Sequence, residues 1–116
     1  MLYINKKLLN LGDATQATVT SNALDVVHVV NASVVAVAVG TTITGTLKVQ
    51  VSNDPMDFTQ GPTNWVDTSN TVSITGAGNF LIPKFDCSYM WMRLVYTKTT
   101  SAAGAKISAF VKTNGI

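Results

Sequence analysis

Charge is scarce in this sequence of 116 residues, because only 12% of the residues are charged, against about 25% in typical soluble domains. A small domain has a large surface for its volume, and charged side chains normally gather there. We therefore expect part of the surface to be hidden against other chains, as in an assembly. The alternative is a soluble monomer whose surface is covered with Thr, Ser, Asn and Gln.

Glutamate is absent altogether, so the six acidic residues are all Asp. The same chain holds sixteen Thr and fifteen Val, which suit a pleated sheet and lose side-chain freedom in a helix. This composition argues against any long exposed helix and favours an all-β fold. At this length, residues 1–116 are expected to form one domain around one core.

Cysteine and basic residues are few as well. Cys87 is alone, which excludes a disulfide within the chain and a zinc site made of four cysteines. The basic residues give a net charge of only +2, and they are scattered apart from Lys6 and Lys7. Because nucleic-acid binding normally requires clustered Lys and Arg, we expect no nucleic-acid partner.

Long apolar runs are also missing. The longest, residues 34–39, is far too short to cross a bilayer, so we expect no membrane partner. Residues 1–11 lack the layout of a signal peptide, since Lys6 and Lys7 follow the first apolar residues. We expect a protein that is made in the cytoplasm and is not processed.

What the chain does contain is a regular alternation of apolar and polar residues. Within residues 45–53, Leu47, Val49 and Val51 fall on one face and polar side chains on the other, and residues 105–113 repeat the pattern. A period of two predicts a sheet with one dry and one wet face. Turn residues separate such segments along the whole chain, which predicts a single antiparallel β-sandwich, jelly-roll-like, with about eight strands.

The strand boundaries define an expected core. Residues 23–31 are predicted as one continuous strand, and residues 33–39 as a central strand whose outer face is covered or meets another subunit. Residues 65–67 and 72–74 are predicted as two separate short strands. The side chains expected in the core are Val26, His28, Val30, Leu47, Val49, Val51, Val72, Ile74, Met92, Leu94, Ile107, Ala109 and Val111.

Two segments carry more apolar side chains than a free terminus or a loop needs. Residues 1–11 are expected to lie against a sheet edge or a neighbouring subunit, as an interaction arm, because untethered termini are poorly ordered. The loop of residues 53–64, with two apolar side chains near its tip, is the other expected contact. The predicted protein-interaction residues are Leu2, Tyr3, Ile4, Leu8, Leu9, Met56 and Phe58.

Four blocks carry a resemblance to known proteins: residues 47–55, 64–67, 76–78 and 89–97. They resemble small structural proteins of tailed and other bacterial viruses, which are compact jelly-roll or β-sandwich modules that decorate or cement a virion. The resemblance implies a non-enzymatic protein that associates with itself and with other virion proteins. It would stabilise a capsid, a neck or a tail surface, be made in the host cytoplasm and need no cofactor. The chain is short for a major capsid subunit.

The late aromatic strand allows an alternative function. The sequence Trp91-Met92-Arg93 resembles the aromatic-X-Arg pattern of galactose-binding-like sandwich modules, which implies a carbohydrate-binding module. Its glycan would stack on surface aromatics, for which Trp65, Tyr89, Trp91 and Tyr96 are the candidates. The competing interpretation is that these side chains are core and interface anchors.

No catalytic or metal-binding pattern accompanies the strands, so we expect no enzyme and no metal. Asp25 falls on the opposite strand face from His28, which leaves that imidazole without an orienting carboxylate. Cys87 is expected to be a small apolar core residue, because only one cation lies near it in the sequence. The loop residues Asn53, Asp54, Asp57 and Asp67 could hold calcium, but their spacing matches no EF-hand loop and they are also ordinary turn formers.

Overall fold

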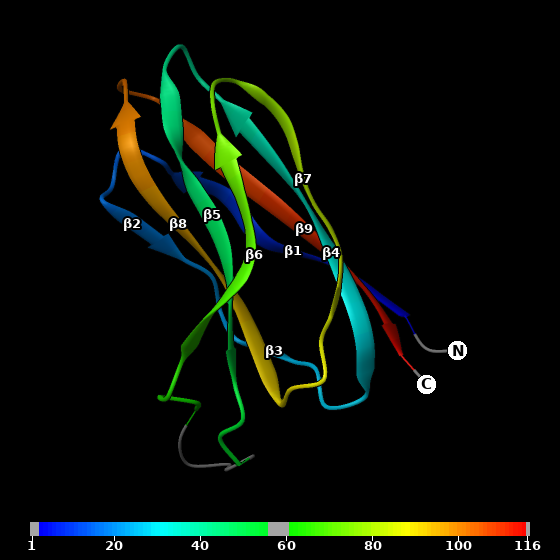
Figure 1. Cartoon of the computed structure of the whole chain (residues 1–116). Coiled ribbons are helices and arrows are strands. Elements are labelled where there is room, and N and C mark those ends of the chain that lie inside the picture. The colour runs from blue at the N-terminus through cyan, green and yellow to red at the C-terminus, as the bar shows by residue number, and fades with distance from the viewer. Residues whose placement is uncertain (1–2, 56–60, 116) are drawn as a thin grey trace.

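The computed structural model describes residues 3–55 and 61–115, and within them nine strands form two antiparallel sheets packed face to face (Figure 1). The strands are β1 (Tyr3–Asp13), β2 (Thr18–Thr20), β3 (Leu24–Asp25), β4 (Val29–Val39), β5 (Ile43–Ser52), β6 (Val66–Ile74), β7 (Gly78–Asp86), β8 (Trp91–Ser101) and β9 (Lys106–Gly115). The four-stranded sheet has the order β1-β9-β4-β7, and the five-stranded sheet has the order β2-β8-β5-β6 with β3 also paired to β8.

The connectivity is that of a jelly roll. Apart from the two-residue β3, only β5 and β6 are consecutive strands that pair directly, and every other connection passes from one sheet to the other. Such crossing connections between two antiparallel sheets define the double Greek-key arrangement. The predicted antiparallel jelly-roll-like sandwich is therefore confirmed.

The core lies between the two sheets, where the inward-facing side chains of one sheet meet those of the other. Ten of the predicted core side chains are buried: Val26, Leu47, Val49, Val51, Ile74, Met92, Leu94, Ile107, Ala109 and Val111. Val72 is half-buried and packs against the same cluster. The period-two pattern thus assigned the faces of β5, β8 and β9 correctly.

The prediction for His28 and Val30 was wrong, because both side chains are exposed. The expected strand of residues 23–31 is broken by a turn, in which the Asp25 carboxylate accepts a hydrogen bond from the Val27 N–H at 3.1 Å. An aspartate that bonds the backbone two residues ahead favours a turn over a continued strand. The alternation restarts in β4, whose buried residues are Ala32, Val34, Ala36 and Ala38.

The N-terminal segment is an edge strand of the sandwich. β1 pairs antiparallel with β9, from Tyr3 opposite Asn114 to Asp13 opposite Lys106. Leu9 is only 4% exposed and belongs to the core, so its side chain is used within this chain. A sheet edge was one of the two positions expected for the arm; its contact with a neighbouring subunit stays a prediction.

Candidate functional site

The outer face of the four-stranded sheet carries an apolar surface. The register places Phe110 beside Val35 and Val35 beside Leu81, across three neighbouring strands. Val35 is 41% exposed, Leu81 55% and Val39 48%. We define the apolar outer face as Val35, Val37, Val39, Leu81 and Phe110.

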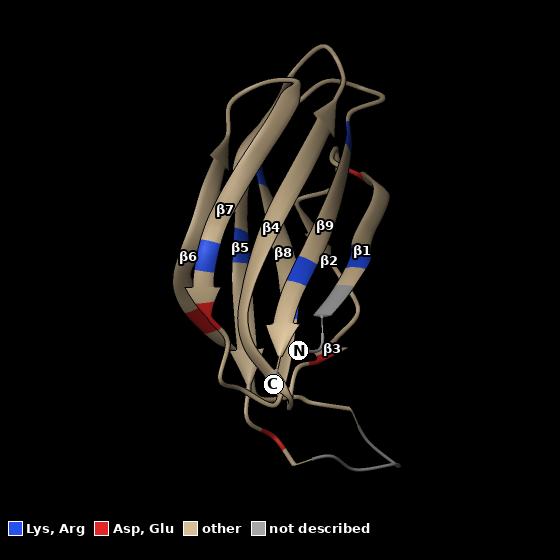
Figure 2. Ribbon diagram, turned by 90° about the vertical axis from the view of Figure 1, so that its right-hand side faces the viewer, with Lys and Arg blue, Asp and Glu red and all other residues tan. Residues whose placement is uncertain are grey.

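Three lysines lie across one end of this apolar outer face. Lys7, Lys84 and Lys112 are exposed, and Figure 2 shows basic positions on β1, β7 and β9 at about the same height of the sheet. The Lys7 ammonium lies 5.0 Å from the centre of the Phe110 ring, which is within the range of a cation–π contact. The surface is therefore apolar along β4 and β7 and basic at the end where the three lysines lie.

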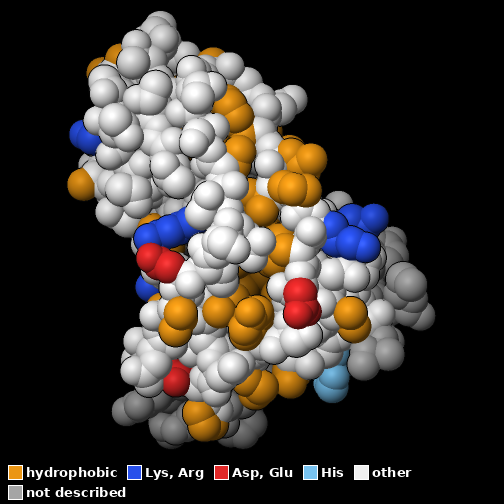
Figure 3. All heavy atoms as spheres, in the orientation of Figure 1, with side chains coloured by type: hydrophobic (Ala, Val, Ile, Leu, Met, Phe, Trp, Pro, Cys, Tyr) orange, Lys and Arg blue, Asp and Glu red, His pale blue; other side chains and the backbone are white. Residues whose placement is uncertain are grey.

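The outer face of the five-stranded sheet is built from polar groups that bind one another. Arg93 Nε donates to Gln50 Oε1 at 2.7 Å, and Gln50 Nε2 donates to Asp67 Oδ1 at 2.7 Å. Lys48 Nζ lies 3.0 Å from the other Asp67 oxygen. The hydrogen bond from Gln50 and then that from Lys48 lower the pKa of Asp67. Over the upper part of this face, Figure 3 shows mainly polar side chains and backbone.

The four aromatic residues predicted as a sugar platform do not share one surface. Tyr96 is completely buried, and its hydroxyl donates to the Thr44 carbonyl at 3.1 Å. The Arg93 guanidinium lies 4.3 Å from the centre of the Trp65 ring and covers one of its faces. Tyr89 precedes β8 and lines a pocket. Tyr96 is therefore a core anchor, which is the interpretation weighed against a sugar platform in the sequence analysis.

Both tryptophans fasten the stems of the loop of residues 53–64. Trp91 Nε1 donates to the Asp54 carbonyl at 3.1 Å, and Trp65 Nε1 donates to a carbonyl in the returning stem at 3.2 Å. The Asp54 carboxylate accepts the N–H groups of Thr63 and Asn64 at 2.7 and 2.9 Å. Hydrogen bonds from Asn64 and then Thr63 lower the pKa of Asp54. The predicted contact residues Leu2, Met56 and Phe58, and the calcium candidate Asp57, lie outside the described residues, as do the side chains of Tyr3 and Ile4.

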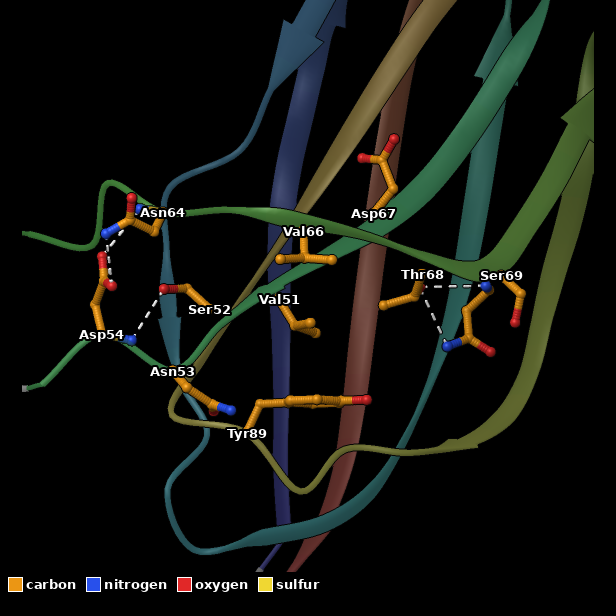
Figure 4. A pocket seen from close by; sticks show the side chains of 11 residues that line it. Val51, Ser52, Asn53, Asp54, Asn64, Val66, Asp67, Thr68, Ser69 and Tyr89 are labelled. Atoms are coloured by element: carbon orange, nitrogen blue, oxygen red, sulfur yellow. Dashed lines mark hydrogen bonds between the residues drawn. The ribbon is translucent and has the colours of Figure 1, made fainter.

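A pocket of about 620 Å³ opens at the edge of the sandwich, where the end of β5, the start of β6 and Tyr89, two residues before β8, meet (Figure 4). Its apolar walls are Val51, Val66 and Tyr89. Its polar lining includes Asn53, Asp54, Asn64, Asp67, Thr68, Ser69 and Asn70. Sequence analysis did not predict it, because the residues come from segments that only the register brings together.

One wall of this pocket is a β-bulge. Lys48 pairs with Thr71 and Gln50 pairs with Asp67, so a single β5 residue stands opposite residues 68–70 of β6. The Thr68 hydroxyl donates to the β5 carbonyl of this bulge at 2.8 Å. That hydroxyl also accepts the backbone and side-chain N–H groups of Asn70 at 3.2 and 3.3 Å. Bulges re-aim side chains and are common beside functional sites.

The opposite wall is held by hydrogen bonds on both sides of Tyr89. The Cys87 N–H donates to the Val30 carbonyl at 3.0 Å, and the Met90 N–H donates to Asn53 Oδ1 at 3.2 Å. These hydrogen bonds hold the backbone on both sides of Tyr89, whose partly buried side chain packs against the core.

The candidate reactive residues stand apart from the pocket. His28 is exposed in its turn, and Cys87 is buried in the core. Burial, and then the charge of Asp86, raises the pKa of Cys87 to about 11, so the thiol stays protonated at neutral pH. Within residues 3–55 and 61–115, no three His, Cys, Asp or Glu side chains gather as metal ligands. The same residues include no helix long and apolar enough to span a membrane.

Solved structures share this fold, although no protein-family model and no curated protein matches the sequence. The PBSX exported protein XepA superposes with a TM-score of 0.72 at 14% identity over 97% of this chain. The chain spans only 37% of XepA. The SPBc2 prophage-derived protein YomS gives a TM-score of 0.51 at 11% identity, over 97% of this chain and 95% of YomS.

A third similar structure comes from Bacillus endospore appendages, described as disulfide-linked pili, with a TM-score of 0.50 at 9% identity over 99% of this chain and 88% of that one. This chain has the sandwich fold of phage and prophage proteins. The resemblance predicted from the sequence is therefore confirmed for the fold. Identities this low carry no activity or partner with them.

Proposed function

We propose that this protein is a non-enzymatic structural component of a bacterial virus particle, which associates with copies of itself and with other virion proteins. It would decorate or stabilise the capsid or a neck or tail surface. The shared fold with YomS and XepA supports the structural role. The observation that carries the proposal is the apolar outer face, because exposed apolar patches commonly mark protein–protein contacts.

The outer face is a better contact than the free edge of β1. The register of β1 shifts between Lys7 and Leu9 and again between Leu9 and Gly12, and Lys6 and Lys7 are both exposed on this strand. Bulges and edge lysines oppose the addition of another strand. The apolar outer face would meet a partner through side chains and does not require the addition of a strand, although Lys7 lies against Phe110 there.

An interface centred on this surface would extend beyond its five side chains. A stable protein–protein contact takes about 800 Å² from each partner, so the polar side chains around the apolar outer face would be buried with it. Burying the apolar outer face between copies would remove valine, leucine and phenylalanine side chains from water. Because only the folded chain can form that contact, association would also stabilise the fold.

Sedimentation velocity of a matched pair of variants tests the proposal. Val35 and Val27 are each 41% exposed, but only Val35 belongs to the apolar outer face. We expect the wild type and Val27→Asp to form oligomers as concentration rises, and Val35→Asp to remain monomeric. A wild type that stays monomeric, or a Val35→Asp variant that assembles like the wild type, contradicts the proposal.

A further inference from the structure

We infer that the pocket between β5, β6 and Tyr89 is a binding site for a neutral pyranose sugar. The inference does not depend on the proposed self-association, because the pocket is lined by β5, β6 and Tyr89 and the apolar outer face belongs to the other sheet. It also differs from the aromatic platform expected from the sequence, since neither tryptophan lines the pocket.

The size and the apolar walls suit a sugar ring. Pockets for small molecules typically measure about 300–1,000 Å³, and this one measures about 620 Å³. Figure 4 shows the Tyr89 ring lying across the pocket, with Val51 and Val66 on the other side. Val51 and Val66 pair across the strands, yet Val51 is 6% exposed and Val66 63%. The sandwich is therefore open here, and the C–H face of a pyranose would pack on the tyrosine ring.

The polar lining offers unused hydrogen-bonding groups of both kinds. Asn53 uses its side-chain oxygen for the Met90 N–H, and Asn70 uses its side-chain nitrogen for Thr68. Among the described residues, Asn53 Nδ2, Asn70 Oδ1 and the Tyr89 hydroxyl have no hydrogen-bond partner. These groups are a donor, an acceptor and a hydroxyl that can donate or accept. They suit a sugar, because each sugar hydroxyl can also donate and accept a hydrogen bond.

The charges favour a neutral ligand. Among the residues that the structure describes, no Lys or Arg lines the pocket, so a phosphate or carboxylate would find no cationic partner there. Asp54 is occupied by the N–H groups of the returning loop stem. Asp67 points away from the pocket in Figure 4 and binds Lys48 and Gln50. A ligand with many hydroxyls and no charge fits what remains.

The walls are already in place for such a ligand. The Thr68 hydroxyl holds the bulge and Asn70 in place, and the Asp54 carboxylate holds the returning loop stem. The Asn53 side chain holds the backbone next to Tyr89. A preformed site loses little conformational entropy when it binds, and that favours affinity for a small ligand. Binding of a single sugar ring is nevertheless expected in the millimolar range.

Amide NMR titrations with galactose, glucose and N-acetylglucosamine test the inference on the full chain. We expect saturable shifts at the pocket residues for at least one of the three sugars, and none with a sugar phosphate at the same concentration. Tyr89→Ala is expected to weaken binding about tenfold or more, and Asn70→Ala to weaken it less. Tyr89→Phe should keep most of the affinity, because it keeps the ring.

Phe110→Ala is the matched control, because it truncates a half-buried aromatic side chain on the other sheet and should leave sugar binding unchanged. Val35→Asp should also bind the sugar as the wild type does, which separates this inference from the proposed self-association. The inference is overturned if no neutral sugar gives saturable shifts, or if a folded Tyr89→Ala variant binds as well as the wild type. The inference is also overturned if the amide signals of the pocket residues shift with protein concentration in the absence of sugar, since a second copy of the chain would then occupy the site.

Discussion

The two outer faces of this sandwich differ in how their side chains meet water. On the five-stranded sheet, Arg93, Gln50, Asp67 and Lys48 form a continuous chain of hydrogen bonds whose outer atoms remain hydrated. On the four-stranded sheet, valine, leucine and phenylalanine stand at the corresponding outward positions. A face that only had to be soluble would not need them. The difference is the basis for the proposal that the four-stranded sheet, and not the five-stranded one, meets a partner.

The largest expected effect separates the core from both outer faces. Leu94 is completely buried on β8, whereas Leu81 is 55% exposed on β7. We expect Leu94→Ala to lower the free energy of unfolding by about 2–5 kcal/mol, because it removes buried methyl groups and leaves a cavity. Leu81→Ala should cost less than about 0.5 kcal/mol in the monomer. Urea unfolding at low protein concentration measures both, and equal losses would contradict the assignment of Leu81 to an uncovered face.

A smaller loss of stability is expected at Gly45, where β5 of the five-stranded sheet packs closely against β8. A Cβ added to Gly45 would collide with the Thr97 carbonyl oxygen and with the buried Tyr96 side chain. We expect Gly45→Ala to cost about 1–3 kcal/mol, as overpacking of a tight site does. Gly61→Ala is the control, since nothing lies within 4 Å of the added methyl group. Thermal unfolding compares the two, and an unchanged Gly45→Ala variant would show that β5 and β8 can move apart there.

The response of self-association to salt sharpens the comparison of the faces. If two copies bury the apolar outer face, Lys7, Lys84 and Lys112 of each copy approach those of the other. Salt screens this repulsion, since the Debye length is about 10 Å at 0.1 M. The association constant of the dimer should therefore rise as ionic strength increases. Sedimentation at several sodium chloride concentrations measures it. Association that weakens with salt would instead indicate attraction between opposite charges and a different pair of surfaces.

Much of the sandwich could be predicted from the sequence because its strands alternate cleanly. The inward face of β5 can be assigned from the alternation of Leu47, Val49 and Val51 alone, with no information about the neighbouring strands. The error at His28 has a local cause that a closer examination of Asp25 could have found, since aspartate readily caps a turn two residues on. The hydrophobic pattern alone gives no sign of it, because valines stand on both sides of the turn.

The pocket could not be predicted from the sequence for a different reason. Residues 65–67 and 72–74 were expected as two strands, but they belong to one strand, β6, except for residue 65, and a bulge interrupts its pairing. A bulge depends on the register between β5 and β6, which are separated by a loop, and no local propensity encodes that register. Similarly, the position of Trp65 beside Arg93 arises only when β6 and β8 lie on either side of β5.

The smallest expected effect concerns the hydrogen-bond chain of the solvated face at low pH. The pKa of Asp67 is lowered below its usual value of 3.8, first by the hydrogen bond from Gln50 and then by that from Lys48. A carboxyl group with a lowered folded-state pKa stabilises the fold above its unfolded pKa, and that contribution is lost as pH falls through the folded pKa. We therefore expect Asp67→Asn to lose stability at neutral pH and to show a shallower acid limb below about pH 4. Lys48→Gln should give a weaker change of the same sign, because it leaves the larger Gln50 contribution in place. Melting temperatures between pH 2 and pH 7 measure all three proteins, and superimposable acid limbs for wild type and Asp67→Asn would show that water satisfies Asp67 equally well.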